Sequence, residues 1–96
     1  MRQLTVALQI DLFYVSHCSA CHRVLPRLRR IASGYGSSVL VRELDVLEYL
    51  DEAVAAGVRC TPSLVVQGHV RLAGAFTDSA LKALLEELEL KPEKTS

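Results

Sequence analysis

The chain has 96 residues, of which 50% are hydrophobic, with 11 basic and 11 acidic side chains. This length permits one domain with one modest core, and the hydrophobic content argues against disorder over most of the chain. A formal net charge of zero argues against a protein that binds nucleic acid by electrostatic attraction. We expect one folded domain over residues 1–90 and a flexible tail over residues 91–96.

The cysteine count and the N-terminal stretch bear on the compartment. Gln9 and Asp11 interrupt the apolar stretch near the N-terminus, so we expect neither a signal peptide nor a transmembrane segment. Three cysteines, an odd number, do not suit a secreted disulfide scaffold. We therefore expect a cytoplasmic protein with no membrane contact. In that compartment, closely spaced cysteines are more often catalytic or metal-binding than structural.

The first predicted element is a β-strand from Leu4 to Val15. Apolar residues alternate along it with period two, at Leu4, Val6, Leu8, Ile10, Leu12 and Tyr14. The intervening positions are only partly polar, which favours a central strand that is covered on both faces. Asp11 and Leu12 are neighbours, so their side chains should point to opposite faces of the sheet.

A helix is predicted from His22 to Ile31, directly after Cys18 and Cys21. Its inward side chains, at helical spacing, are Val24, Leu25, Leu28 and Ile31. Gly34 is suited to the position just past the end of this helix, where glycine is common. We expect a loop over Tyr35–Ser38.

Cys18 and Cys21 are close enough in the sequence for their thiols to form and break one disulfide. A helix N-terminus carries about half a positive charge from its aligned peptide dipoles. This charge favours the thiolate, which is the reactive form of a cysteine. We therefore predict that Cys18 is a nucleophile with a lowered pKa and that Cys21 is its resolving partner.

His17 and His22 flank the cysteine pair and are candidate modulators. A protonated imidazole would favour the Cys18 thiolate, and a neutral one could shuttle a proton to Cys21. Both histidines are equally consistent with exposed residues at the start of a helix. Cys21-His22 also completes a CxxCH pattern typical of c-type haem attachment. The β-rich organisation and the lack of an export signal argue against haem, and we expect no cofactor.

A second strand and a second helix are predicted next. The strand begins at Val39 and ends near Asp45, which is also a plausible N-cap for the following helix. The side chains expected to face inward from that helix are Leu47, Leu50 and Val54. Gly57 should end it.

Two strands and a final helix complete the chain. We expect strands over Ser63–Gln67 and Val70–Ala73, joined by a two-residue turn at Gly68-His69. The last helix, capped by Thr77 or Asp78, presents an apolar face made by Leu81, Leu84, Leu85 and Leu88.

The predicted order is therefore β-α-β-α-β-β-α. The first two strands should be parallel with a right-handed crossover, because a helix joins them. The last two strands form an antiparallel hairpin. This gives an α/β protein with a four-stranded mixed sheet and helices on both faces.

This order, with a CxxC motif after the first strand, resembles the thioredoxin fold in its minimal, glutaredoxin-sized form. The resemblance covers Leu4–Leu88, nearly the whole chain. Pro26 stands where thioredoxins carry a proline in the first helix. Thr61-Pro62 opens the third strand, where the family has its cis-proline, and Gly74-Ala75 precedes the last helix as in thioredoxins.

The resemblance implies a thiol–disulfide oxidoreductase, either a protein disulfide reductase or an electron relay. Cys18 and Cys21 would be its catalytic residues. Thr61 would contact an extended substrate segment through its backbone, and Pro62 would shield the disulfide. The implied partners are protein substrates that carry disulfides, with a reductase or glutathione as the electron donor. We expect a monomer.

The chain also departs from the family pattern. His17 stands where thioredoxins usually have tryptophan, and Ser19-Ala20 replaces the Gly-Pro of thioredoxins or the Pro-Tyr common in glutaredoxins. Thioredoxins bury an aspartate six positions before the first cysteine, and here that position is Leu12. The usual proton acceptor for Cys21 is therefore expected to be missing.

Two alternative functions remain open from the sequence. The first is a glutathione-dependent, glutaredoxin-like enzyme, although Gly74–Asp78 only loosely resembles the Gly-x-Asp stretch of glutaredoxins. The second is a metal-binding module in which Cys18, Cys21 and Cys60 hold zinc or an iron–sulfur cluster, with a fourth ligand from elsewhere. Cys60 is otherwise a third redox thiol or a small, half-buried apolar residue.

Overall fold

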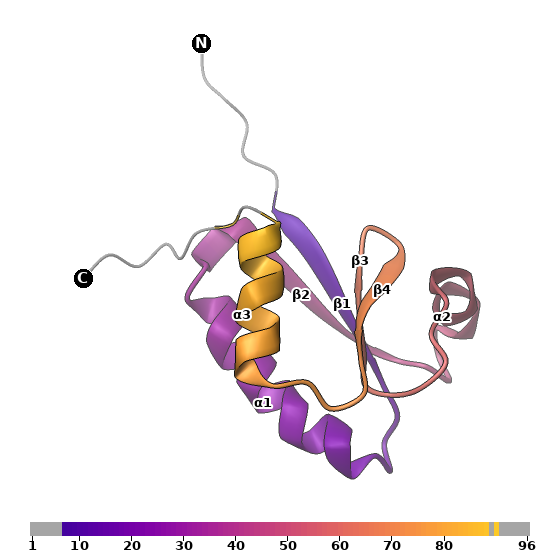
Figure 1. Cartoon of the computed structure of the whole chain (residues 1–96). Helices are drawn as coiled ribbons and strands as arrows, with labels where there is room; N and C mark the ends of the chain where they lie inside the picture. The colour runs from indigo at the N-terminus through magenta and orange to yellow at the C-terminus, as the bar shows by residue number, and fades with distance from the viewer. Residues whose placement is uncertain (1–6, 89, 91–96) are drawn as a thin grey trace.

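The computed structural model describes residues 7–88 and residue 90. Within these residues, four strands form one mixed sheet in the order β2-β1-β3-β4, with helices on both faces (Figure 1). The elements are β1 (Leu8–Tyr14), α1 (Ser19–Ser33), the 3₁₀ helix η1 (Gly36–Ser38), β2 (Val39–Asp45), α2 (Leu50–Ala56), β3 (Ser63–Val66), β4 (His69–Ala73) and α3 (Asp78–Glu87). The predicted order β-α-β-α-β-β-α is confirmed.

The sheet combines one parallel pair with two antiparallel pairs. β1 runs parallel to β2 and antiparallel to β3, and β3 runs antiparallel to β4. The expected parallel crossover and C-terminal hairpin are both present. Residues 4–6 of the predicted first strand and the predicted tail lie outside the described residues.

Two apolar cores lie on opposite faces of the sheet. Side chains of α1, α3, β1 and β3 form the larger core, which includes Ile10, Leu12, Val24, Leu28, Leu64, Leu81, Leu84 and Leu85. α2 covers the other face above a smaller core of Phe13, Leu44, Ala53 and Val65. Figure 1 shows α1 and α3 side by side on one face and α2 alone on the other. No helix among residues 7–88 is long and apolar enough to cross a membrane.

α1 is longer than the sequence predicted at both ends. It begins at Ser19 rather than His22, because the side chain of Cys18 caps its first turn. It ends at Ser33, and the N–H of Gly34 donates to the carbonyl oxygen of Ile31 at 3.1 Å. Gly34 keeps a right-handed conformation, with φ −70°, so this helix ends without a left-handed glycine.

The prediction for the second helix was wrong in its start and in its buried face. Asp45 does not cap the helix: its carboxylate accepts the N–H of Leu47 at 2.8 Å, within a turn that delays α2 until Leu50. Ala53 is the residue that α2 buries, whereas the side chains predicted to face inward, Leu47, Leu50 and Val54, are all exposed. Gly57 ends the helix as predicted, with φ +87°.

The hairpin turn lies one residue earlier than predicted. Gln67 and Gly68 form it, with φ of +54° and +82°, and His69 is already the first residue of β4. Positive φ at both central residues suits the right-handed twist of a hairpin, and glycine adopts it without strain. The correction also shortens β3, which ends at Val66.

α3 is capped by Thr77, one of the two predicted residues. The Oγ1 atom of Thr77 accepts the N–H of Ala80 at 3.0 Å. Asp78 instead pairs with α1, its carboxylate accepting a hydrogen bond from Arg30 at 2.8 Å and lying 4.0 Å from Arg27. This contact joins α3 to the helix that carries the cysteines.

Candidate active site

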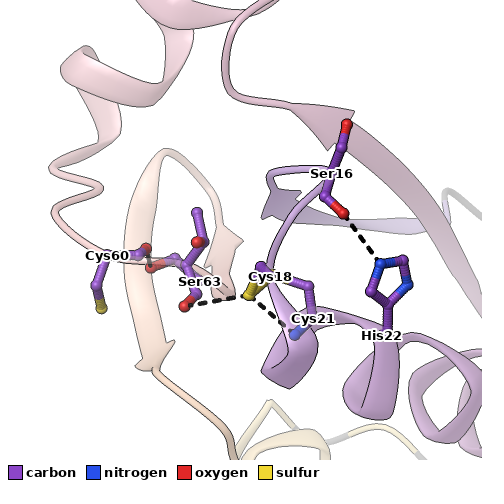
Figure 2. The surroundings of a disulfide bond; sticks show 7 residues. Ser16, Cys18, Cys21, His22, Cys60 and Ser63 are labelled. Carbon is purple, nitrogen blue, oxygen red and sulfur yellow. Dashed lines mark hydrogen bonds between the residues drawn. A yellow bond between two sulfur atoms is a disulfide. The ribbon is translucent and has the colours of Figure 1, made fainter.

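Cys18 and Cys21 form a disulfide at the start of α1 (Figure 2), with their Cα atoms 5.2 Å apart. Cys21 lies inside the first turn of the helix and is 1% exposed, whereas Cys18 is only partly buried. A reacting molecule therefore reaches Cys18 more easily than Cys21. This order of exposure is the one that the predicted roles of nucleophile and resolving cysteine require.

Cys18 occupies the N-cap position of α1. Its backbone is extended, with φ −108° and ψ 108°, and its Sγ atom accepts the N–H of Cys21 at 3.0 Å. Its carbonyl oxygen accepts the first bond of the helix, from the N–H of His22 at 3.2 Å. The first turn contains no acidic side chain. In the reduced protein, the helix terminus therefore favours a thiolate on Cys18 without competition from a neighbouring carboxylate.

The loop before β3 lies against the cysteine pair. The Thr61–Pro62 peptide bond is cis, and the carbonyl oxygen of Thr61 lies 3.8 Å from the Sγ atom of Cys18. Pro62 is buried, and its own carbonyl oxygen accepts the N–H of Gly74 at 2.8 Å. The structure thus brings the Thr61–Pro62 loop to Cys18, and the residue that follows β4 holds this loop in place.

The two flanking histidines have different surroundings. The Nε2 atom of His22 donates to the carbonyl oxygen of Ser16 at 3.0 Å, which holds the ring against the loop that precedes Cys18 (Figure 2). His17 is exposed. In the described part of the chain, no hydrogen bond links either ring to a cysteine sulfur. The modulating roles of both residues stay predictions.

The structure does not bring Cys60 to the disulfide. Cys60 is an exposed free cysteine, and Figure 2 shows its sulfur pointing away from Cys18. Its backbone is held by Ser63, whose hydroxyl donates to the carbonyl oxygen of Cys60 at 2.6 Å. Over the described residues, no three His, Cys, Asp or Glu side chains are grouped closely enough to hold a metal ion. A metal site made by the three cysteines therefore finds no support.

Ser63 is a site residue that the sequence reasoning missed. It is fully buried directly after Pro62, and its hydroxyl ties the loop together through the Cys60 carbonyl. A hydroxyl residue placed between a Thr-Pro pair and an apolar strand was the available signal.

A buried leucine replaces the family's carboxylate on the first strand. Leu12 is 0% exposed and belongs to the core beneath α1. The neighbouring Asp11 points to the other face, where it accepts two hydrogen bonds from Arg42, at 2.9 and 3.0 Å. These hydrogen bonds raise the pKa of the Arg42 guanidinium. Asp11 is therefore committed to an ion pair on the face away from the cysteines.

The family model for thioredoxin matches residues 6–88. The chain belongs to the thioredoxin family. The matched span includes all the strands and α-helices described above. Thiol–disulfide redox chemistry is the general activity of this family, and the Cys18–Cys21 pair is the dithiol of this chain.

Solved thioredoxin structures resemble the chain over most of its length. The germline-specific thioredoxin Deadhead from Drosophila melanogaster has a TM-score of 0.73 at 23% identity, covering 86% of this chain and 82% of its own. The oxidised thioredoxin from Plasmodium falciparum has a TM-score of 0.67 at 27% identity, covering 84% and 80%. A mutant thioredoxin from Halobacterium salinarum has a TM-score of 0.69 at 27% identity, covering 93% and 78%. No curated protein matches the chain.

Proposed function

We propose that the protein uses its Cys18–Cys21 dithiol to reduce disulfides in protein substrates, as a reductase or an electron relay, and is itself oxidised to the Cys18–Cys21 disulfide. The observation that carries this proposal is the position of Cys18, which caps α1 with its Sγ atom while remaining accessible. Cys21, bonded to it, is 1% exposed. The sulfur of Cys18 can thus react with a partner, while the sulfur of Cys21 stays buried beside it.

The reaction begins with the reduced protein. The Cys18 thiolate attacks one sulfur of a substrate disulfide, forms a mixed disulfide and releases the other substrate sulfur as a thiolate. Cys21 then loses its proton and attacks the Sγ atom of Cys18. This step restores the Cys18–Cys21 disulfide and releases the second substrate thiolate. Two electrons pass to the substrate, and a reductase or glutathione returns them to the protein.

The loop before β3 suits an extended substrate segment. The Thr61 carbonyl oxygen lies 3.8 Å from Cys18, so a chain paired with the Thr61 backbone would bring its own sulfur close to the nucleophile. Backbone pairing depends little on substrate side chains. This mode of binding therefore supports a range of protein substrates rather than one small molecule.

Reduction of insulin by dithiothreitol, measured with and without the protein, tests the proposal. The wild type should accelerate the reaction, and Cys18→Ser should abolish the acceleration. Cys60→Ser is the matched control, because it removes an exposed thiol away from the pair, and it should retain full activity. Equal inactivity of the wild type and Cys18→Ser across several protein disulfides would refute the proposal.

Mass spectrometry distinguishes the two electron donors. The protein is incubated with oxidised glutathione. If the cycle depends on glutathione, a glutathione adduct should form on Cys18, and Cys21→Ser should trap it best. Absence of the adduct, together with reduction by a thioredoxin reductase, would assign the donor to the reductase.

A further inference from the structure

A row of large apolar side chains lies exposed along α2 and the turn before it. We call Leu47, Leu50 and Val54 the α2 stripe; they are 80%, 53% and 69% exposed. Leu50 and Val54 are four positions apart and therefore share one face of the helix. The Asp45 carbonyl oxygen accepts the N–H of Tyr49 at 3.0 Å, so the turn that holds Leu47 already has helical hydrogen bonding. Tyr49, 40% exposed, lies between them in the sequence.

The fold does not use the α2 stripe. α2 packs against the sheet through Ala53, which is 2% exposed and belongs to the smaller core. Isolated apolar residues on a surface are ordinary, but several large ones in a row mark a surface that another molecule covers. The α2 stripe is therefore available for a partner without any change in the fold.

The surroundings of the α2 stripe are acidic. Residues 45–58 contain four carboxylates, Asp45, Glu48, Asp51 and Glu52, and no lysine or arginine. Glu48 and Asp51 are exposed, and neither forms an ion pair within the described part of the chain. α1 differs, because its Arg27, Arg29 and Arg30 all pair with carboxylates of other elements. Glu52 lies 4.0 Å from Arg42, so among the described residues Glu48 and Asp51 are the carboxylates beside the α2 stripe that stay exposed without an ion pair.

These charges select among the molecules that could cover the stripe. An anionic membrane surface would repel Glu48 and Asp51. A two-fold contact between copies of this chain would bring the carboxylates of both copies into one interface and would supply no lysine or arginine from residues 45–58 to pair with them. A partner that combines large apolar side chains with lysine or arginine satisfies both parts of the surface.

We propose that the α2 stripe, with Glu48 and Asp51, is a docking surface for a basic, apolar segment of a partner protein. The surface begins where β1 and β2 end, which is also where the chain leads into the cysteine motif. There the backbone N–H of Val46, the residue before Leu47, donates to the carbonyl oxygen of Tyr14 at 2.9 Å. Tyr14 ends β1, the strand that precedes Cys18. A partner bound to this surface stays near the end of β1, where disulfide exchange takes place.

Binding of a labelled synthetic peptide tests the proposal. The probe is an amphipathic peptide with leucines on one face and flanking lysines, labelled with fluorescein and followed by anisotropy. One control peptide has glutamates in place of the lysines, and another has serines in place of the leucines. The wild type should bind the leucine–lysine peptide more tightly than either control, and added salt should weaken this binding.

Matched variants locate the peptide on the protein. The double variant Leu50→Ser/Val54→Ser and the double variant Glu48→Lys/Asp51→Lys should each weaken binding about tenfold. Leu40→Ser and Glu86→Lys change exposed residues outside the surface and should leave binding unchanged. Circular dichroism confirms that each variant is folded.

Three results would overturn the proposal. The wild type and both double variants could bind the leucine–lysine peptide equally well, or the wild type could prefer the glutamate peptide. Sedimentation could also show that the wild type is a dimer and that Leu50→Ser dissociates it. Insulin reduction, driven by dithiothreitol, should be unchanged in both double variants. A failure of docking is thus separate from a failure of the redox proposal, which Cys18→Ser tests.

Discussion

The Sγ atom of Cys18 lies 3.8 Å from the carbonyl oxygen of Thr61, although 43 positions separate the two residues in the sequence. This contact joins the N-terminus of α1 to the loop that opens β3. β1 makes the contact possible, because it pairs with β3 and also leads into the cysteine motif. The central strand therefore sets the distance between the nucleophile and the backbone that would receive a substrate.

Removal of the resolving cysteine should trap a reaction intermediate. In Cys21→Ser, Cys18 still attacks a substrate disulfide, but no thiol is left in the motif to release the product. We expect a mixed disulfide with insulin to accumulate, visible as a reducible adduct on a non-reducing gel. Cys18→Ser should form none. An adduct that maps to Cys60 instead would contradict the assigned roles.

The N-cap of α3 should contribute measurably to stability. Thr77→Ala removes the acceptor for the N–H of Ala80 and should lower the free energy of unfolding by about 1 kcal/mol. Thr77→Ser keeps the hydroxyl oxygen and should cost much less. Urea denaturation measures both variants. Equal stability of Thr77→Ala and Thr77→Ser would show that the cap is not formed by this side chain.

Two truncations of leucine to alanine should differ in their effect on stability, because one leucine is buried and the other is exposed. Leu64 is 0% exposed in the larger core, so Leu64→Ala should destabilise the protein by about 2–5 kcal/mol. Leu50 is 53% exposed, so Leu50→Ala should change stability by less than about 0.5 kcal/mol. Thermal and urea unfolding test the pair. A loss at Leu50 comparable to that at Leu64 would mean that α2 buries the face that the sequence predicted.

The ion pair between α1 and β2 should make stability depend on pH. Two hydrogen bonds from Arg29, at 2.6 and 2.7 Å, lower the pKa of the Glu43 carboxyl. A lowered pKa in the folded state means that the stabilisation is fully present above the unfolded value, about 4.3, and is lost as the pH falls through the folded value. Glu43→Gln should therefore be less stable than the wild type at neutral pH.

The stability difference between Glu43→Gln and the wild type at neutral pH should shrink at an acid pH, as the pH falls through the lowered pKa of Glu43 and the carboxyl becomes protonated in the folded state as well. Urea denaturation at both pH values measures this change. The control is Glu86→Gln, an exposed residue that forms no ion pair within the described residues. A difference at Glu43 that persists unchanged into acid would argue against the ion pair as its source.

Periodicity predicted the elements that bury a continuous apolar face. β1, α1 and α3 were found where alternating or helical apolar spacing placed them, because each packs a whole row of side chains into the larger core. The same reasoning gave a wrong start and a wrong buried face for α2. Leu47, Leu50 and Val54 have helical spacing, but the carboxylate of Asp45 accepts the N–H of Leu47 in a turn, and the helix starts only at Leu50. A small residue, Ala53, takes the buried position.

The candidate site was predictable in its local part and less so in its long-range part. The placement of the CxxC motif next to a helix start follows from neighbouring residues, but the cap by Cys18, which moves that start to Ser19, was not predicted. The orientation of Cys60 depends on how its loop is tied by Ser63, which no spacing rule encodes. The role of Leu12 as a packed core residue follows from alternation, and it leaves the proton acceptor of Cys21 unassigned.

The reactivity of Cys18 as a function of pH tests the central claim most directly. The reduced protein is alkylated with iodoacetamide across a pH series, and mass spectrometry follows Cys18, Cys21 and Cys60 separately. We predict that Cys18 reacts fastest below neutral pH, with an apparent pKa below the ordinary cysteine value of about 8.5. A pKa near that ordinary value, or faster alkylation of Cys21 than of Cys18, would contradict the account.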